Sequence, residues 1–462
     1  MEIVLKPFKL GNQYYVYDRN TNKILAVPKQ DYEVLCSNQS STEKNAVLKK
    51  YQSKGFFLEN RLTEIKHPAN DFVTQFEEEN VTQLILQVTQ DCNLRCSYCY
   101  YVNESYRNRH HAKLNMSVDT ARKAMDYLLS HSVGKDNITL GFYGGEPLLR
   151  MDILKYCIEY MESQVQDRRI LFTLTTNGTL LTDDIIEYFI AHNVALFISL
   201  DGTKETHDRN RKFVNGHGSF DIVMWNVAHI KERYPEYFKT IYFNTVISPE
   251  MDMKCVRDYY SADEVLATAN FTSSTIQEFY TDDPPQYDDR LYIDSQYGEF
   301  KALLICAGRL SAKDIPFIYQ GDISDIRKLQ ENLHTDFLLP SAYHHGGPCI
   351  AGSRRLFVDV AGNFYPCERV SESSETMKIG SLEEGLNLEK VLNLINVGKI
   401  TENECKRCWA LVHCRICAAW ADNLTGLDKS KKLQACPLYK SSVLHRFKNV
   451  CALSQFTHHK IK

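Results

Sequence analysis

Three closely spaced cysteines constrain this chain more than any other feature. Three residues separate Cys92 from Cys96 and two separate Cys96 from Cys99, and residues 83–89 just before them read as a buried strand. Three thiolates on one tight loop can bind three irons of a 4Fe–4S cube and leave the fourth iron without a protein ligand. An open metal position is typical of catalytic sites. A zinc knuckle and three unrelated buried cysteines are the alternatives, although zinc motifs usually contain paired CxxC units or histidines.

Length and charge exclude several classes of protein. The chain has 462 residues and a formal net charge of −4 from 54 basic and 58 acidic residues, which argues against a nucleic-acid-binding surface. No apolar run of about 18 residues occurs and no secretory segment is visible at the N-terminus, so we expect a cytoplasmic protein without a membrane partner. The 15 cysteines therefore indicate metal binding rather than disulfides.

The middle of the chain alternates between strand and helix patterns. Such alternation predicts βα units with a parallel sheet, and functional residues at the carboxyl ends of its strands. The predicted strands are 83–89, 138–143, 170–176, 195–200 and 240–247, and the predicted helices are 117–132, 151–165, 181–193, 219–234 and 252–260.

The N-terminal residues 1–76 show a different pattern. Strand-like runs at 14–18 and 24–27 flank a turn-rich segment and predict a β-hairpin. Helical segments follow at 30–36 and 42–54. A hairpin with helices of this size resembles a small winged-helix-like module.

The motif Gly144-Gly145-Glu146-Pro147 ends the second predicted strand. Two glycines allow the backbone to approach a ligand closely, and Glu146 offers a carboxylate to a cation. An ordinary strand-to-helix turn is the alternative.

Further polar groups end the next strands. Asn177 follows one strand, and Ser199 and Asp201 follow another, where ordinary turn chemistry is an equally good explanation. Arg211 can pair with a carboxylate in a bidentate fork. His207, nearby, is expected to be structural.

Together, the cysteine loop and these strand-end motifs resemble the radical S-adenosylmethionine (SAM) superfamily. The resemblance implies that the open iron chelates SAM, that the Gly-Gly-Glu-Pro element receives its ammonium group, and that an aromatic residue contacts its adenine. The residues implied to bind SAM are Tyr98, Gly144, Gly145, Glu146, Asn177, Ser199, Asp201 and Arg211.

A second set of cysteines occupies the C-terminal third. The set resembles the SPASM domain, with two residues between Cys414 and Cys417 where that family often has three. The resemblance implies two auxiliary 4Fe–4S clusters, and zinc is the alternative, although the central spacing is much shorter than in a zinc ribbon. One cluster is assigned to Cys405, Cys408, Cys414 and Cys436, and the other to Cys349, Cys367 and Cys417.

The cysteines outside these patterns lack ligand spacing. We expect them to be buried small apolar residues. They are Cys36, Cys157, Cys255, Cys306 and Cys451.

The resemblance predicts an α/β enzyme with a partial (β/α)6 TIM-like barrel between a peptide-recognition module and a SPASM domain. The expected divisions are a winged-helix-like leader-recognition module at 1–76, the barrel at 77–265, a bridging region at 266–348, the SPASM domain at 349–440 and a tail at 441–462.

The implied function is radical modification of a ribosomally made precursor peptide, with formation of Cys thioether crosslinks. SAM and three 4Fe–4S clusters are the implied cofactors, and a flavodoxin or ferredoxin is the implied electron donor. Glu368, beside Cys367, is a candidate proton acceptor. The alternatives are an anaerobic sulfatase-maturating, formylglycine-forming enzyme, which would have Asp at position 368, and a non-catalytic iron–sulfur electron carrier.

Overall fold

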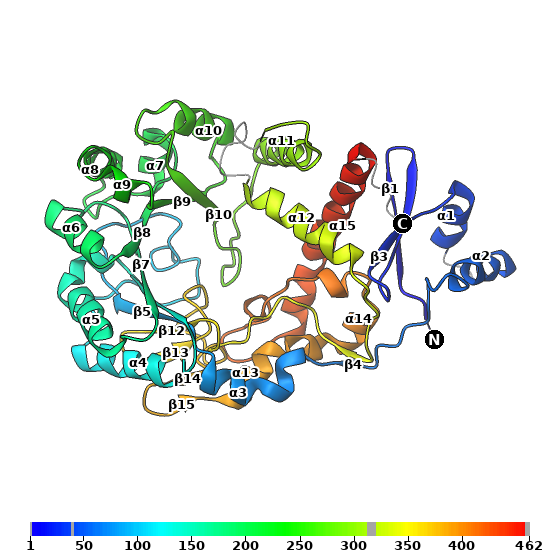
Figure 1. Cartoon of the computed structure of the whole chain (residues 1–462), viewed down its shortest axis with the longest axis horizontal. Helices are drawn as coiled ribbons and strands as arrows, with labels where there is room; N and C mark the ends of the chain where they lie inside the picture. Colours follow the sequence, from blue (N-terminus) through cyan, green and yellow to red (C-terminus); the bar gives the residue numbers. More distant parts are fainter. Residues whose placement is uncertain (1, 38–40, 312–319, 458–462) are drawn as a thin grey trace.

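A curved sheet of ten strands forms one half of the protein, at the left of Figure 1. The computed structural model describes residues 2–37, 41–311 and 320–457. Parallel strands in the order β10-β9-β8-β7-β6-β5 make up most of this sheet, which confirms the predicted α/β class. They are β5 (Gln83–Thr89), β6 (Asn137–Gly144), β7 (Arg169–Thr176), β8 (Val194–Ser199), β9 (Tyr242–Ile247) and β10 (Asn270–Thr275).

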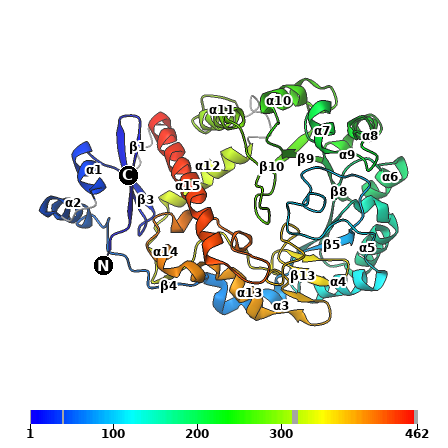
Figure 2. The same ribbon diagram turned by 180° about the vertical axis from the view of Figure 1, so that it is seen from behind.

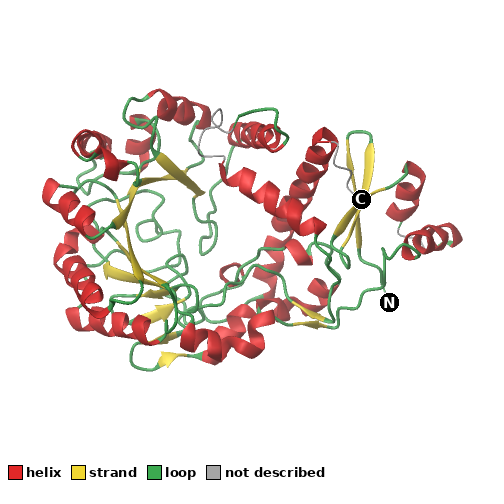
Figure 3. Cartoon of the chain, viewed as in Figure 1, coloured by secondary structure: helices red, strands yellow, loops and turns green. Residues whose placement is uncertain are grey.

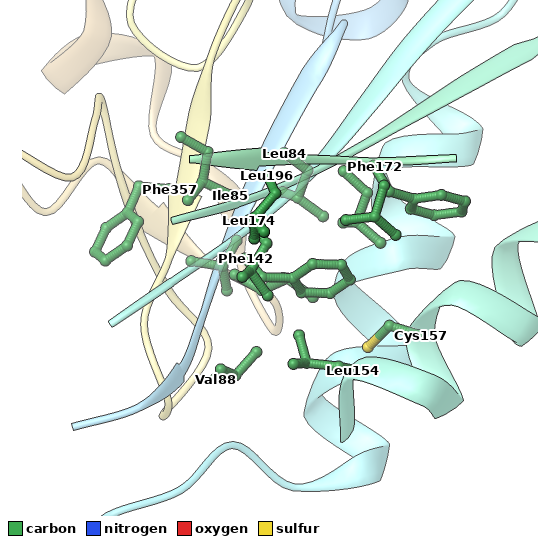
Figure 4. Packing of buried hydrophobic residues seen from close by; sticks show 14 of the residues in the cluster. Leu84, Ile85, Val88, Phe142, Leu154, Cys157, Phe172, Leu174, Leu196 and Phe357 are labelled. Carbon is green, nitrogen blue, oxygen red and sulfur yellow. The ribbon is translucent and has the colours of Figure 1, made fainter. Parts of the chain in front are cut away.

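Helices line the outer side of these parallel strands (Figure 3). Apart from α7 (Lys204–Asn210), whose buried residues are His207 and Asn210, these helices bury apolar side chains, and the removal of this surface from water stabilises the fold. For example, Leu154 and Cys157 lie in the same buried cluster as Phe142 of β6 (Figure 4). The helices are α4 (Val118–Ser130), α5 (Met151–Gln164), α6 (Asp183–Ala191), α7 (Lys204–Asn210), α8 (Phe220–Arg233), α9 (Pro235–Phe238) and α10 (Met253–Ala262).

The sequence predicted five of the parallel strands and missed β10. Only Phe271 of this strand is buried, and the other positions are polar, so β10 contains no apolar run. The division expected at residue 265 therefore separates β10 from the sheet to which it belongs.

The cysteine-rich part of the chain extends the same sheet. β12 (Leu356–Val358) pairs in parallel with β5, and β13 (Asn363–Tyr365), β14 (Gly380–Ser381) and β15 (Gly385–Leu386) continue it in antiparallel order. Residues 349–367 and the strand that carries the first cysteine loop therefore share one rigid framework.

The remaining helices surround the cysteine-rich part. α15 is 29 residues long and has buried side chains at Val443, Phe447 and Val450, so the division expected at residue 440 falls inside a packed helix. A two-stranded sheet pairs β4 (Glu64–Ile65) with β11 (Ala342–Tyr343). The helices are α3 (Val73–Glu79), α11 (Asp289–Cys306), α12 (Gln320–His334), α13 (Leu388–Ile395), α14 (Glu402–Lys406) and α15 (Lys429–Thr457).

The N-terminal module is a three-stranded antiparallel sheet with two helices (Figures 1 and 2). Its elements are β1 (Leu5–Leu10), β2 (Gln13–Asp18), β3 (Lys23–Ala26), α1 (Lys29–Cys36) and α2 (Thr42–Gln52). The predicted hairpin is β2–β3, whereas β1 was not predicted. The winged-helix class remains a prediction.

Both faces of this small sheet are covered. Val16 and Leu25 pack with residues of α1 and α2, whereas Tyr17 and Ile24 pack with Phe447 of α15. β1 and β3 are the edge strands, so only the edges remain for pairing with another chain.

The cysteines expected to be buried divide into two groups. Cys157 and Cys451 are buried, as predicted, and Cys306 is half-buried. The prediction is wrong for Cys36 and Cys255, which are exposed. Both are helical, and helix positions that face solvent can hold a cysteine without loss of packing.

None of the helices within the described ranges combines the length and apolar character needed to cross a membrane.

Candidate active site

The cysteine loop follows β5 and is fixed by its backbone. The Arg95 amide donates to the Lys212 carbonyl at 2.7 Å, and the Ser97 amide donates to the Asn210 carbonyl at 3.1 Å. These bonds attach the loop to the end of α7 and the residues just after it, and hold the three thiols on one framework.

All three thiols border a cavity of about 690 Å³ at the carboxyl ends of the parallel strands. Burial raises the pKa of Cys92 and of Cys96 to about 12; the charge of Glu146 adds to the rise at Cys92, whereas the charge of Arg211 opposes it at Cys96. Burial also raises the pKa of Cys99. Without a metal these thiols stay protonated at neutral pH, whereas metal coordination deprotonates a thiol outright.

Gly144 and Gly145 also border the cavity, and they pack tightly against the backbone before the cysteines. A Cβ at Gly144 would lie 2.2 Å from the Thr89 carbonyl oxygen, and one at Gly145 would lie 1.9 Å from that of Asp91. The Gly145 amide donates to the Thr89 carbonyl at 2.9 Å. The two glycines therefore dock this turn on the cysteine loop.

The Glu146 carboxylate points into the protein and does not border the cavity. It accepts hydrogen bonds from the Thr176 hydroxyl at 2.7 Å and from the amides of Asn177 and Leu148 at 2.7 and 3.0 Å. Burial raises the pKa of Glu146 to about 6, although these hydrogen bonds oppose the shift. In this structure the hydrogen bonds of Glu146 link the turn after β6 to the end of β7.

Asp201 is also fully buried and binds side chains from two directions. It accepts from Arg211 Nε at 2.8 Å, from the Val246 amide at 2.9 Å and from the Tyr98 hydroxyl. Arg211 lies over the Tyr98 ring, 5.5 Å from its centroid. Tyr98 and Arg211 border the cavity, so Asp201 positions two groups that face it.

Asn177, Ser199 and Thr176 border the cavity as well. The Asn177 side-chain amide donates to Asn93 Oδ1 at 2.8 Å and lies 3.9 Å from the Cys92 sulfur. His207, expected to be structural, forms a hydrogen bond of 3.0 Å between its Nε2 and Ser219 Oγ. Burial lowers the pKa of His207 to about 3. It is therefore an internal neutral residue.

The first C-terminal group brings together Cys349, Cys367 and Cys417. Burial is the main cause of their raised pKa values, and the thiols of Cys349 and Cys417 further raise the pKa of Cys367. These thiols therefore lie close to one another although they come from separate segments.

The second group brings together Cys405, Cys408, Cys414 and Cys436. The thiols of Cys405 and Cys436 raise the pKa of Cys408, in addition to burial. Lys432 lies among them and is only 1% exposed. Its Nζ donates to Thr401 Oγ1 at 2.6 Å and lies 3.7 Å from the Cys405 sulfur.

Within the described residues, Lys432 has no salt bridge to a carboxylate, and no group of three or more His, Cys, Asp or Glu side chains forms a ready site for a metal ion. A 4Fe–4S cube does not need ligands that converge on one point, because each thiolate binds a different iron. A buried ammonium group does need a compensating negative charge, and metal-bound thiolates at this group would provide it.

Glu368 borders the same cavity as the first cysteine loop. Its carboxylate forms a salt bridge with Arg355 Nη1 at 3.1 Å, and its backbone carbonyl accepts from the Tyr100 hydroxyl at 3.1 Å. The negative charge of Glu368 raises the pKa of both Cys349 and Cys367. The carboxylate therefore lies between the cavity and the first C-terminal group.

Sequence reasoning missed a bonded cluster centred on Glu372. This carboxylate accepts from Arg109 Nε, the Tyr101 hydroxyl and the Gln87 side chain, each at 2.6 Å. Arg109 also lies 3.9 Å from the centroid of the Tyr101 ring. The cluster connects the cysteine loop to the cysteine-rich region, and no sequence motif identifies it.

Several cavity residues of the C-terminal half were also not predicted. They come from the loop after β10 and from the cysteine-rich region, so they are distant in sequence from the strand-end motifs. These residues are Glu278, Phe279, Arg369, Trp420 and Tyr439.

Residues 86–261 match the family model described as the radical SAM superfamily. The chain therefore contains a radical SAM domain, and members of this family bind SAM and a 4Fe–4S cluster.

Two kinds of curated relative are similar to this chain. It is 31% identical over 165 residues to a cysteine-type anaerobic sulfatase-maturating enzyme from Clostridium novyi, and the matched segment covers 34% of this chain and 42% of the relative. It is 22% identical over 438 residues to the radical SAM cyclopropyl synthase TigE from Paramaledivibacter caminithermalis, which covers 89% of this chain and 84% of the relative.

A serine-type anaerobic sulfatase-maturating enzyme from Bacteroides thetaiotaomicron is 34% identical over 148 residues, or 32% of this chain and 35% of the relative. The match to either sulfatase-maturating enzyme thus spans less than half of that relative. The solved structure of native anSMEcpe with bound AdoMet has a TM-score of 0.57 and 18% identity, covering 82% of this chain and 99% of that chain. This likeness concerns the fold.

Proposed function

We propose that this protein is a radical SAM enzyme that modifies a ribosomally made precursor peptide and forms Cys thioether crosslinks. One observation carries the proposal: a single cavity is bordered by the thiols of the first cysteine loop and by Glu368, next to Cys367. A substrate residue in that cavity would contact both regions at once.

The residues at the cavity fit the proposed cofactors. Cys92, Cys96 and Cys99 would hold a 4Fe–4S cluster, and Gly144, Gly145, Tyr98, Asn177, Ser199 and Arg211 would surround SAM. Glu146 and Asp201 would not contact SAM directly, because their carboxylates are buried and hydrogen-bonded inside the protein. They would instead position the residues that border the cavity. When bound, SAM and its cluster would supply a 5′-deoxyadenosyl radical that abstracts a hydrogen atom from the substrate.

The chain's own groups would orient and shield this chemistry. Asp201 holds Tyr98 and Arg211 against the cavity, and the Asn177 amide lies beside the Cys92 sulfur. The tyrosines of the cysteine loop and Trp420 would exclude water from the cavity. Glu368 would accept the proton that a substrate thiol loses, with Arg355 stabilising the carboxylate, and the one electron left over when the C–S bond forms would be taken up by the auxiliary clusters.

The two C-terminal cysteine groups would hold the auxiliary clusters of a SPASM-type domain. Lys432 supports this proposal for the second group, because its buried charge requires an anion. In the first group, Cys349, Cys367 and Cys417 would leave one iron position for a substrate cysteine. An external donor such as flavodoxin or ferredoxin would provide electrons, and the cytoplasm remains the predicted location.

The N-terminal module would bind the leader of the precursor by adding a strand at an edge of its sheet. Its two faces are already covered, which leaves the main-chain groups of β1 and β3. Main-chain pairing provides affinity in this binding mode. A module that only packs on the rest of the protein is the alternative. Deletion of residues 1–76 should weaken binding of the precursor, and unchanged affinity in a titration would contradict this role.

The central test uses the full chain reconstituted anaerobically with iron and sulfide. We expect reductant-dependent formation of 5′-deoxyadenosine from SAM, and loss of two hydrogens from a cysteine-containing precursor for each crosslink. A spectroscopic signal of the auxiliary clusters should change when precursor is added and should not change with a Cys-to-Ser precursor. Absence of SAM cleavage would instead favour an iron–sulfur electron carrier.

Sulfatase maturation is a second candidate, favoured by the similarity to two sulfatase-maturating enzymes. The native anSMEcpe structure with AdoMet and the Cp18Cys peptide has the same fold and contains a bound peptide. Glu368 in place of Asp and the N-terminal module argue against this candidate. A sulfatase-derived peptide separates the two: aldehyde formation supports sulfatase maturation, and an unchanged peptide supports crosslinking of a different substrate.

A further inference from the structure

Glu278 is a carboxylate that the proposed chemistry does not use. It lies on the loop after β10, borders the cavity and is half-buried. Burial raises its pKa. Among the residues that the structure describes, none forms a hydrogen bond or ion pair with its side chain. Leaving a partly desolvated carboxylate without a partner costs free energy, so this position is suited to a ligand that supplies one.

Aromatic side chains surround this carboxylate. Tyr106, Tyr287 and Tyr439 each lie close enough that the charge of Glu278 raises their pKa values, in addition to burial. The hydroxyls of Tyr106 and Tyr287 donate instead to the carbonyls of Gln277 and Ile247. These two hydroxyls therefore do not donate to Glu278.

The adjoining wall of the cavity is aromatic as well. The rings of Phe279 and Trp420 lie 5.8 Å apart, and those of Trp420 and Tyr439 lie 6.1 Å apart. All three residues border the cavity. Aromatic faces attract cations within about 6 Å of the ring centroid, more strongly where water is excluded.

Among the residues that the structure describes, no cationic side chain is paired with Glu278. Arg369 borders the cavity too, but it forms no ion pair with Glu278, and its charge lowers the pKa of Cys417 against the larger effect of burial. Arg211 is bound to Asp201. The carboxylate and its aromatic surroundings are thus available to a ligand.

We propose that Glu278, with Trp420 and Tyr439, forms a subsite for a cationic side chain, Lys or Arg, of the peptide substrate. This inference rests on the proposed peptide-modifying function and adds a selectivity: a basic residue near the modified residue. Glu278 would pair with the cation while the rings cover its alkyl chain.

The experiment uses the full chain with its clusters reconstituted, under anaerobic conditions. The probes are N-acetyl-lysine N-methylamide and its neutral analogue N-acetyl-norleucine N-methylamide, titrated by ligand-observed NMR. We expect the lysine probe to bind at least about tenfold more tightly than the norleucine probe, because only the former carries the charge. Glu278→Gln should remove this preference, and Glu278→Lys should reverse it toward N-acetyl-glutamate N-methylamide.

Asp283→Asn is the matched control, because Asp283 lies on the same loop, is exposed and does not border the cavity. This variant should keep the lysine preference. Equal binding of the two probes to the wild-type protein, or a preference that survives in Glu278→Gln, would overturn the proposal. The wild-type comparison holds whether or not a variant folds.

The same preparation separates the subsite from the proposed function. If the wild-type protein forms 5′-deoxyadenosine, crosslinks a precursor and shows no cation preference, the subsite is wrong and the function stands. If it shows the preference and forms no 5′-deoxyadenosine, the function is wrong and the cation site stands.

Discussion

The two cysteine-containing regions of this protein are assembled in different ways. The first takes three thiols from one loop after β5, and backbone bonds to residues 210–212, far away in the sequence, fix that loop. The second takes its thiols from separated segments that come together through the strands β12 and β13 and the long helix α15. Spacing therefore places the three thiols of the first region on one loop, whereas the second region depends on packing over the whole C-terminal half.

The largest expected effect comes from removal of the three thiols of the first cysteine loop. Replacement of Cys92, Cys96 and Cys99 by Ala should abolish formation of 5′-deoxyadenosine and remove about four irons per chain, while the C-terminal cysteines keep their metal. Iron analysis and a SAM-cleavage assay measure both quantities. Cys255→Ala, at an exposed cysteine, should change neither. If SAM cleavage persisted in the triple variant, the assignment of this loop would fail.

The second prediction concerns the C-terminal cysteines and uses a substitution on α15 at a residue that is not itself a cysteine. Phe447 is fully buried, and its ring lies 4.5 Å from Tyr17 and 6.2 Å from Trp409, beside Cys408. Phe447→Ala should reduce local stability by about 3–5 kcal/mol, increase proteolysis of the N-terminal module and lower the iron content. SAM cleavage should continue.

Phe456→Ala provides the comparison on the same helix, because Phe456 is 50% exposed. This change should alter stability by less than about 0.5 kcal/mol. Equal effects of the two substitutions would show that α15 does not support the second region.

Much of this architecture could be predicted because it is local in sequence. The parallel strands have apolar runs, and the Gly-Gly motif marks a turn. The physical reason for these glycines could not be predicted, since it lies in the carbonyls of Thr89 and Asp91 on another segment. Likewise, Asp201 follows a strand, as expected, but its partners come from three separate segments and keep its carboxylate inside the protein.

The C-terminal half shows where prediction from the sequence ends. The resemblance to the SPASM pattern suggested which thiols belong together, and that grouping stays a prediction, but it did not suggest that Lys432 lies beside Cys405, because an isolated lysine carries no pattern. β10 was missed since its side chains are polar and face the cavity. Residues such as Glu278 and Trp420 meet there only through the fold.

The third prediction concerns Glu146, in the first region. Its pKa is about 6 in the folded protein, above the ordinary value of 4.5, so the folded state binds this proton more tightly than the unfolded chain. This contribution to stability is complete below about pH 4.5 and is lost as the pH rises to about 6, by about 2 kcal/mol in total.

Glu146→Gln should remove this part of the pH dependence, as measured by urea unfolding of the metal-free protein between pH 4 and 7. Glu250→Gln, at an exposed carboxylate, should leave it unchanged. The prediction fails if the two variants show the same slope.

The smallest expected effect concerns the cluster proposed for the second C-terminal group, which is Cys405, Cys408, Cys414 and Cys436. The buried ammonium of Lys432 lies 3.7 Å from the Cys405 sulfur and would favour the reduced, more negative state of a cluster bound there. Lys432→Met should therefore lower the reduction potential of that cluster, with about a tenfold change in the ratio of reduced to oxidised cluster, or about 59 mV for one electron.

Lys440→Met should have a smaller effect, because Lys440 also acts on Cys408 and Cys436 but is exposed and screened by solvent. A redox titration followed by electron paramagnetic resonance measures these shifts separately from the cluster of the first region, whose signal should not change. Equal shifts for the two lysines would mean that burial does not strengthen the charge of Lys432, and no shift for either would place the cluster elsewhere in the C-terminal half.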